Sequence, residues 1–348
     1  MPDYAVDRAH LDGQEVYVLR EAASGAEAQI VPALGANCVA LRLPPVGCDE
    51  PPVHVLVSPT RAGDLGPGGY MAGNPILFPF PSRMRRGQFV FESRPVQFDV
   101  DPDTGDHIHG LVASRPWTVD LAEARGDRAM LRVAIQLDSI PEIARQYPYP
   151  CRLTVVYTLR DAALTVKMGV RNTGDGPLPM GLGFHPWFPA AFASEGSRQE
   201  AEVQVPGQRT WVLGSDLLPT GQTVPVSGAL DLQQPRALGA QAYDHIFTDL
   251  IAQAHGAPAG WSEARLRNPW AGQEIVVQAD PQYREWVLYA PPDKPIVCLE
   301  PYTCTADAAN LAPTGVDSGL TVVPPGVTWH GFIRLLVRRT DGGKPAGA

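Results

Sequence analysis

A period-two alternation of apolar residues is the feature of this chain that most restricts its fold. In the segment CRLTVVYTLRDAALTVKMGVRNTG, residues 151–174, every second position is apolar on both sides of a short RDA turn. The alternating residues are Leu153, Val155, Tyr157 and Leu159 before the turn, and Leu164, Val166, Met168 and Val170 after it. Because this period is typical of strands with one buried face, the segment predicts a β-hairpin.

Shorter runs of the same kind follow in the second half of the chain. They are EIVVQ (274–278), EWVLYA (285–290), PIVCLE (295–300) and TWHGFIRLLVRR (328–339), bounded by proline, glycine or aspartate. Helical periodicity with caps does not extend beyond a turn or two, and strands do not alternate with helices as a parallel sheet requires. We therefore expect an all-β fold.

Proline content and the lack of repeats favour one continuous domain. The 348 residues include 36 prolines, about twice the usual share, which suits many strands joined by turns. There is no internal repeat of the kind that marks propellers or solenoids, and no low-complexity linker. We expect residues 1–340 to form a single β-sandwich and residues 341–348, DGGKPAGA, to form a disordered tail.

Charge and hydropathy exclude several classes of partner. The net charge is −9, and arginine pairs such as Arg85-Arg86 form no extended basic face, which argues against a nucleic-acid partner. The start of the chain, MPDYAVDRAH, lacks a basic region followed by an apolar run. No segment approaches the roughly 18 apolar residues of a membrane span. We expect a soluble cytoplasmic protein, either a monomer or a homodimer.

The cysteines give little support for metal, disulfide or nucleophilic chemistry. Their number is odd and no C-x-x-C spacing occurs. None lies beside a histidine that would lower the pKa of its thiol. The five are Cys38, Cys48, Cys151, Cys298 and Cys304.

The segment FPFPSRMRRGQF contains a candidate ligand for oxygen atoms. Apolar neighbours such as Phe80 and Met84 would shelter Arg83, leaving its guanidinium ready for hydroxyl or phosphate oxygens. Arg85 and Arg86 are interpreted as solvated arginines in a turn, because clusters of charge usually face water.

HIHGLVASRPW, residues 107–117, has two histidines two positions apart, which would share a face on a strand. This spacing is compatible with a metal site, although the residues that follow supply no carboxylate of the kind that a cupin-like site needs. Alternatively, His109, which precedes a glycine, could offer a ring nitrogen to a ligand that approaches the backbone closely. A metal site on His107 and His109 therefore stays an alternative.

Two acidic residues are further candidates. In VCLEPYTCTADAAN, Glu300 follows an apolar run and precedes a proline that we expect to end the strand. A lone glutamate there is usually exposed, but one seated between Leu299 and Tyr302 would be partly desolvated, with a raised pKa that suits a general base. In YDHIFT, Asp244 is either a turn aspartate or a second site carboxylate.

The segment MGLGFHPWFPA, residues 180–190, places His185 beside a proline and two aromatic residues, Trp187 and Phe188. The histidine could be a packed core residue, a metal ligand, or an acid that faces a sugar against an aromatic wall. The local sequence alone does not distinguish between these three roles.

Taken together and in order, these segments resemble the aldose 1-epimerase family, the galactose mutarotase-like proteins. The shared features are Arg83 in SRMRRGQF, His109 in HG, the hairpin YPYPCRLTVVYTL, His185 in GFHPWF, Asp244 in YDHIF, Glu300 in LEPYTCTADAAN, and GLTVVPPG. The resemblance spans roughly residues 15–338. It implies a large twisted antiparallel β-sandwich, the galactose mutarotase-like supersandwich, with a sugar cleft across one face.

The resemblance implies catalytic roles for two residues and no need for a cofactor. Glu300 would be the general base that removes the proton of the anomeric hydroxyl, and His185 the general acid that protonates the ring oxygen. The ring would open, rotate about its C1–C2 bond and close as the other anomer. Both groups would have a pKa near neutrality. Burial would raise the pKa of Glu300, and the ordinary pKa of an imidazole is about 6.5.

Sugar binding is the role that the resemblance implies for the remaining residues. Arg83, His109 and Asp244 would hold sugar oxygens through hydrogen bonds. Trp187 or Phe188 would face the C–H side of the sugar.

The identity of the substrate is left open. Ser82 before the arginine and the form of HGLVASRPW look closer to hexose-6-phosphate 1-epimerase relatives than to galactose mutarotases. Arg85 and Arg86 could then meet a phosphate, so we expect a monosaccharide or a sugar phosphate as substrate.

The first hypothesis for the function is therefore an aldose 1-epimerase. A carbohydrate-binding or sensing module without turnover is the second hypothesis, and a metal-dependent enzyme built on His107 and His109 is the third.

Overall fold

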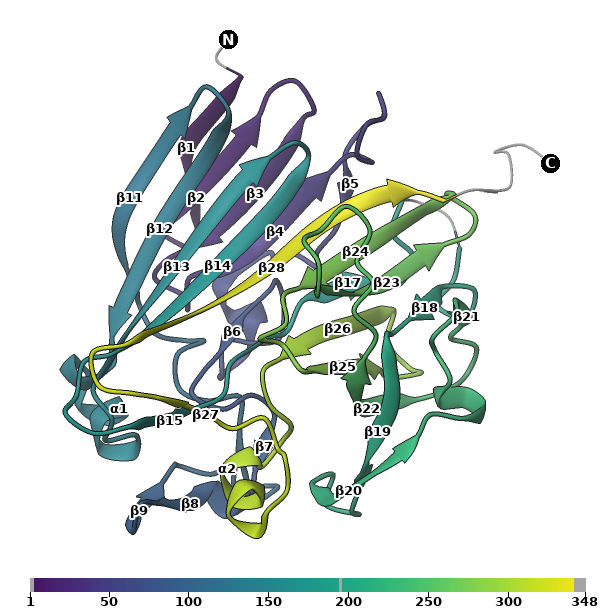
Figure 1. The fold of residues 1–348 in the computed structure, drawn as a ribbon. Coiled ribbons are helices and arrows are strands. Elements are labelled where there is room, and N and C mark those ends of the chain that lie inside the picture. The colour runs from purple at the N-terminus through teal and green to yellow at the C-terminus, as the bar shows by residue number, and fades with distance from the viewer. Residues whose placement is uncertain (1–2, 194–195, 341–348) are drawn as a thin grey trace.

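The computed structural model describes residues 3–193 and 196–340, so the predicted tail lies outside the described residues (Figure 1). Its regular structure is mostly strands that pair antiparallel, which confirms the predicted fold class. The described part contains two short α-helices, α1 (Pro141–Gln146) and α2 (Ala308–Leu311). It also contains 3-10 turns at Ala62–Leu65, Arg85–Gly87, Leu137–Ser139, Gly228–Leu230 and Ala312–Thr314. None of the described helices is long and apolar enough to cross a membrane.

A nine-stranded sheet runs through the molecule in the order β11-β12-β13-β14-β28-β24-β23-β18-β21. Its strands are β11 (Thr118–Arg125), β12 (Arg128–Gln136), β13 (Cys151–Arg160), β14 (Ala163–Asn172), β18 (Glu202–Gln204), β21 (Arg236–Ala237), β23 (Ser262–Asn268), β24 (Gln273–Ala279) and β28 (Thr328–Arg339). The predicted hairpin is β13 and β14, with Leu153 opposite Val170. The predicted strands at 274–278 and 328–339 are β24 and β28.

A five-stranded sheet, β1 to β5, covers one part of this sheet. In Figure 1 it lies behind β11 to β14, and β1 and β2 contact β11, β12 and β13. Its strands are β1 (Tyr4–Leu11), β2 (Gln14–Glu21), β3 (Ala26–Val31), β4 (Asn37–Leu43) and β5 (Val53–His54). Alternate apolar residues of both layers, such as Leu19, Ala28, Val133 and Val155, are buried between them in the main core.

The third large sheet has eight strands, in the order β20-β19-β22-β25-β26-β16-β6, with β17 also paired to β26. Its strands are β6 (Ile76–Leu77), β16 (Gly183–Phe184), β17 (Trp187–Pro189), β19 (Gly207–Leu213), β20 (Pro219–Pro225), β22 (Tyr243–Leu250), β25 (Glu285–Ala290) and β26 (Ile296–Tyr302). The predicted strands at 285–290 and 295–300 are β25 and β26. Two-stranded pairs complete the described fold: β7 (Arg83–Met84) with β10 (His107–Ile108), β8 (Gln88–Phe91) with β9 (Arg94–Gln97), and β15 (Leu178–Met180) with β27 (Thr321–Val323).

The predicted end of β26 at Pro301 is wrong, because the strand continues to Tyr302. A proline lacks an N–H, so it is tolerated in a strand only where no ladder bond is needed from its nitrogen. On one side, β26 pairs with β17 at Ile296, Val297 and Cys298 and with β16 at Tyr302, and no pair is described there at Pro301. Glu300 is therefore inside a strand and buried, rather than exposed at its end.

Candidate active site

Three adjacent strands present a common face to a pocket. In β22, β25 and β26, Asp244 pairs with Tyr289, Tyr289 pairs with Cys298, and Val287 pairs with Glu300. Paired residues of neighbouring strands project to the same side of a sheet, and residues two apart on one strand do so too. This register therefore places the side chains of these five residues on the same face of the sheet.

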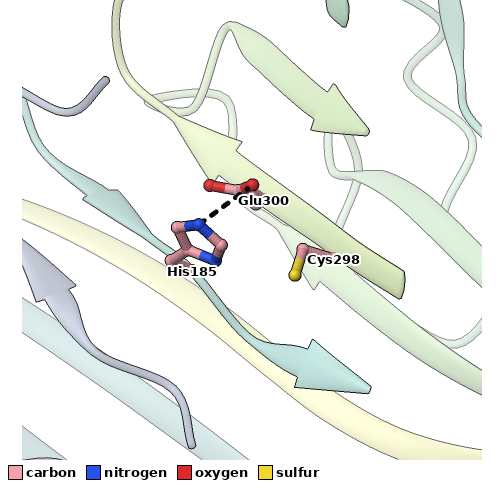
Figure 2. A group of neighbouring side chains, drawn as sticks. All are labelled: His185, Cys298 and Glu300. Carbon is pink, nitrogen blue, oxygen red and sulfur yellow. Dashed lines mark ion pairs between the residues drawn. The ribbon is translucent and has the colours of Figure 1, made fainter. Parts of the chain in front are cut away.

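His185 lies opposite Glu300, in the gap between β16 and β17. The two short strands pair with β26 at Tyr302 and at Cys298 in one continuous register, and that register places His185 across from Glu300. Pro186, which has no N–H, interrupts the ladder at this point. Nε2 of His185 is 3.5 Å from Oε1 of Glu300 (Figure 2).

A pocket of about 160 Å³ lies over this pair. All six residues that the sequence predicted for the site line it: Arg83, His109, His185, Trp187, Asp244 and Glu300. The remaining lining residues are Tyr70, Met71, Ser82, Ile108, Val287, Tyr289 and Tyr302. Segments that lie far apart in the sequence thus meet at one pocket.

Burial shifts the proton affinities of the opposed pair in opposite directions. It raises the pKa of Glu300 well above its usual value, although the hydroxyl of Tyr302, which donates to Oε2, acts against this. It lowers the pKa of His185 to about 3, because desolvation disfavours the imidazolium. The predicted raised pKa of Glu300 is confirmed, whereas the expected near-neutral pKa of His185 is wrong. Burial therefore favours the neutral form of each group.

Trp187 contacts His185 directly. The two rings are stacked with centroids 4.9 Å apart and planes 4° from parallel. The indole N–H donates to the carbonyl oxygen of Tyr70 at 2.7 Å, which fixes the indole in place. Trp187 therefore holds the plane of the imidazole as well as lining the pocket. Phe188, the alternative aromatic candidate, is fully buried in the main core.

His109 presents a hydrogen-bond donor to the pocket. The backbone N–H of Ser82 donates to its Nδ1 at 3.3 Å, so the proton of the neutral ring is on Nε2. Burial lowers the pKa of His109 well below its usual value, which keeps the ring neutral. Its ring packs edge-on against His185, with centroids 5.2 Å apart. His109 thus suits a role as a neutral donor to a ligand oxygen.

The two histidines of HIHG do not act together, contrary to the expectation for a strand. β10 ends at Ile108, and His109 adopts a left-handed backbone with φ of 64°. His107 instead stacks on Phe98, and its Nδ1 is 2.7 Å from the carbonyl oxygen of Asp99. A metal site on His107 and His109 has no support from this geometry.

Arg83 and Asp244 form an ion pair at the pocket, with Nη2 and Oδ2 3.8 Å apart. Burial raises the pKa of Asp244, and the charge of Arg83 acts in the opposite direction. The apolar neighbours expected to shelter the arginine, Phe80 and Met84, are buried as predicted. The pocket therefore offers one guanidinium and one carboxylate side by side.

Arg85 and Arg86 do not line the pocket. Arg85 donates to Asp216 at 2.8 Å and lies 3.8 Å from Asp307. The backbone N–H of Arg86 donates to Asp106 at 2.7 Å. A phosphate contact from these two arginines, considered from the sequence, has no support here.

One group of possible metal ligands occurs among the described residues: His185, Cys298 and Glu300. Figure 2 shows the thiol and the carboxylate projecting from the same strand toward the side where His185 lies. One ligand atom from each residue lies within 4.8 Å of the other two. All five cysteines, which fall in the described ranges, are free.

Sequence reasoning did not assign three tyrosines to the site. Tyr302 lies two residues after Glu300, and Tyr289 lies two residues after Val287, so the strand period could have predicted both. Tyr70 comes from a segment rich in glycine and proline, where no periodicity indicates its direction.

Comparison with known proteins agrees with this architecture. The family described as Aldose 1-epimerase matches residues 19–336 of the chain. An uncharacterized protein of Escherichia coli, YphB, is 24% identical over 259 residues, covering 72% of this chain and 78% of that protein. Human galactose mutarotase is 25% identical over 209 residues, covering 57% of this chain and 58% of the human protein.

Solved structures with the same fold cover nearly the whole chain. A galactose mutarotase-like protein from Clostridium acetobutylicum has a TM-score of 0.87 at 22% identity, over 97% of this chain and 99% of the other. Galactose 1-epimerase from Lactobacillus acidophilus has a TM-score of 0.73 at 15% identity, over 98% and 100%. The fold is therefore the galactose mutarotase-like β-sandwich.

Proposed function

Because the chain belongs to the aldose 1-epimerase family, we propose that it interconverts the α and β anomers of a neutral aldose. The observation that carries this proposal is the opposed pair of His185 and Glu300, 3.5 Å apart and buried at the pocket. Anomer exchange requires one group that takes a proton from the anomeric hydroxyl and another that gives a proton to the ring oxygen.

We assign the base to Glu300 and the acid to His185. The carboxylate takes the hydroxyl proton while the imidazolium protonates the ring oxygen, so the C1 to ring-oxygen bond breaks and an aldehyde forms. After rotation about C1–C2, Glu300 returns its proton to the carbonyl oxygen and His185 takes back the proton of the hydroxyl that closes the ring. The product is the other anomer, and the enzyme is restored.

The neutral forms that burial favours match one stage of this cycle. Neutral His185 beside a protonated Glu300 is the state that the reaction reaches after ring opening. The cyclic sugar opens once the proton has moved from Glu300 to His185, across the 3.5 Å that separate them. The positive charge of Arg83, which lowers the pKa of Glu300, favours that transfer.

Three side chains would orient the sugar. His109 donates from Nε2, Arg83 donates from its guanidinium, and Asp244 accepts from a hydroxyl. Trp187 would act mainly as a positioning residue that keeps the imidazole plane fixed.

The charges around the pocket favour a neutral substrate. Among the described residues that line the pocket, Arg83 is the one arginine or lysine, and it is paired with Asp244. A phosphate dianion would have to share that guanidinium with a carboxylate and lie close to Glu300. A hydroxyl, in contrast, can accept from Arg83 and donate to Asp244 without a net charge to neutralise.

The proposal is tested by following the optical rotation of fresh α-glucose and α-galactose with chelator-treated protein. We expect a faster approach to the anomeric equilibrium, with the equilibrium itself unchanged. Binding of either sugar without any acceleration would instead support the carbohydrate-binding module considered from the sequence.

A further inference from the structure

We propose that His185, Cys298 and Glu300 form a zinc-binding site that overlaps the reacting pair, so that Zn²⁺ is a reversible inhibitor of this protein. The inhibitory effect rests on the proposed function, whereas the binding of the ion does not. The three side chains supply nitrogen, sulfur and oxygen, the donor atoms that zinc takes in proteins.

The spacing of the donors fits one ion. With zinc bonds of about 2.0 to 2.1 Å to nitrogen and oxygen, two ligands of a tetrahedral ion lie about 3.4 Å apart. Nε2 of His185 and Oε1 of Glu300 are 3.5 Å apart, longer than the usual hydrogen bond of about 2.7 to 3.2 Å. The thiol of Cys298 lies within 4.8 Å of both donor atoms. A side-chain rotation that moves the sulfur by about 1 Å would complete three of the four tetrahedral positions.

The strand geometry explains why the donors converge. Cys298 and Glu300 are two residues apart on β26, so both project toward the side where His185 lies (Figure 2). His185 and Glu300 also line the pocket, which leaves the fourth position of the ion open to a water or a sugar oxygen. Three protein ligands with one open position is the arrangement typical of accessible zinc sites.

Neighbouring groups already hold the ligands in place. The hydroxyl of Tyr302 donates to Oε2 of Glu300, leaving Oε1 for the ion. Trp187 stacks on His185 and fixes its plane. Nδ1 of His185 is buried without a hydrogen-bond partner among the described residues, so the orientation of the ring depends on the stacked indole. The carboxylate and the imidazole therefore need little reorganisation, and the thiol is the ligand that moves.

The donor set selects zinc over the common divalent ions. Magnesium and calcium prefer oxygen ligands, whereas a thiolate and an imidazole favour zinc. Binding releases the thiol proton of Cys298 and the carboxyl proton of Glu300 to solvent. The bound ion then occupies the lone pairs of His185 and Glu300 that the proposed reaction needs, so turnover stops until a chelator removes it.

The test compares wild-type protein with Cys298→Ala and with Cys304→Ala as a matched control. Cys304 is equally buried but is not in the ligand group. Chelator-treated proteins are titrated with Zn²⁺ by calorimetry and with Co²⁺ by absorption, which reports a thiolate ligand directly. Thermal melting of each protein checks that the fold is intact.

We expect wild type and Cys304→Ala to bind one Zn²⁺ per chain, to show the thiolate-to-cobalt absorption band, and to lose activity until a chelator is added. Cys298→Ala should stay active, lose the band and bind zinc at least about tenfold more weakly. Equal zinc binding by wild type and Cys298→Ala, or no zinc binding by wild type, would overturn the proposal. Because calorimetry and absorption need no turnover, a protein without epimerase activity would still give a clear answer.

Discussion

Glu285 and Glu300 are buried carboxyl groups on neighbouring strands, and their surroundings differ. Glu300 faces the pocket and His185. Glu285 accepts from the indole N–H of Trp211 at 3.0 Å and from the hydroxyl of Thr248 at 3.1 Å, and it does not line the pocket. Burial raises the pKa of Glu285 to about 8 even with these two donors. Its proton affinity therefore bears on stability rather than on the reaction.

We predict that Glu285→Gln changes how stability depends on pH. The native pKa of about 8 lies above the ordinary value of 4.5, so the native state binds the proton more tightly than the unfolded state does. Wild-type stability should therefore fall as pH rises from about 4.5 to 8 because of this group. The variant lacks this loss and should gain up to about 4 kcal/mol relative to wild type between pH 5 and pH 9.

Urea unfolding of both proteins at the two pH values measures this gain. Other groups titrate in both proteins alike, so the difference between the two isolates Glu285. A difference in unfolding free energy that stays constant with pH would contradict the assigned pKa.

At the residue scale, the sequence predicts some proton affinities and misses others. The raised pKa of Glu300 was predictable, because an apolar run before it and Tyr302 after it indicate desolvation. The lowered pKa of His185 was not, because it depends on burial beneath Trp187 and His109, and His109 comes from a distant segment. Local sequence patterns do not predict contacts between segments that are far apart in the chain.

Among the elements, the turn after β10 determines where His109 points. His109 and Gly110 both have positive φ, and a Cβ on Gly110 would lie 2.2 Å from the carbonyl oxygen of Phe78. The N–H of Leu111 donates to that same oxygen at 2.7 Å, so the two segments approach closely. Glycine at 110 is required both by its backbone angle and by the lack of space.

We predict that Gly110→Ala lowers kcat/KM at least about tenfold, because the clash displaces His109 and small displacements of a binding group are costly. The matched control is Gly105→Ala, where φ is 74° and no atom lies within 4 Å of the added Cβ. The control should lose about 1 kcal/mol of stability from the left-handed backbone and keep its activity.

Steady-state kinetics and thermal melting of the two variants separate these effects. If both variants lose the same activity, the close approach at Phe78 does not position His109.

Some of the long strands were predicted from the sequence, and the shortest strands were not. β13 and β14 carry clear alternation, and β24, β25, β26 and β28 contain shorter apolar runs. All six lie where strands were predicted, although β26 continues to Tyr302. β16 and β17 have two and three residues, too few to show a period. The register that sets His185 opposite Glu300 depends on these two strands, so it could not be predicted from local patterns.

The negative net charge of the whole molecule disfavours the association of anionic substrates. The chain carries a net charge of −9, and the described lining of the pocket contains a single arginine, which is paired with Asp244. The field of a negatively charged protein lowers the local concentration of anions and slows their association. Neutral sugars do not experience this effect.

We predict that kcat/KM for glucose exceeds that for glucose 6-phosphate at least about tenfold at low ionic strength. Added salt should raise the value for the phosphate and leave that for glucose unchanged, because it screens charges beyond a Debye length of about 8 Å at physiological ionic strength. Polarimetry of both sugars over a series of salt concentrations measures this. A preference for the phosphate that is lost in Arg83→Gln would show that Arg83 binds a phosphate instead.

At the scale of the whole molecule, the order of the motifs identified the architecture correctly. Arg83, His109, His185, Asp244 and Glu300 are far apart in the sequence, and the structure brings them to one pocket. The sequence did not reveal how the nine-, five- and eight-stranded sheets are ordered, since sheet order depends on long-range pairing. It also did not reveal that Arg85 donates a hydrogen bond to Asp216. This contact removes one reason to expect a phosphate group on the substrate.

The most direct test of the proposed mechanism is the rate of anomer exchange at equilibrium, measured by saturation-transfer NMR for wild type, His185→Asn and Glu300→Gln. We predict that wild type transfers saturation between the α and β anomers of glucose or galactose. Each variant should lower the exchange rate at least about 10²-fold while its thermal melting shows an intact fold. The matched control is His330→Asn, an exposed histidine on β28, which should exchange like wild type. Near-normal exchange in either variant would remove that residue from the mechanism and contradict the assignment of His185 and Glu300 as the reacting pair.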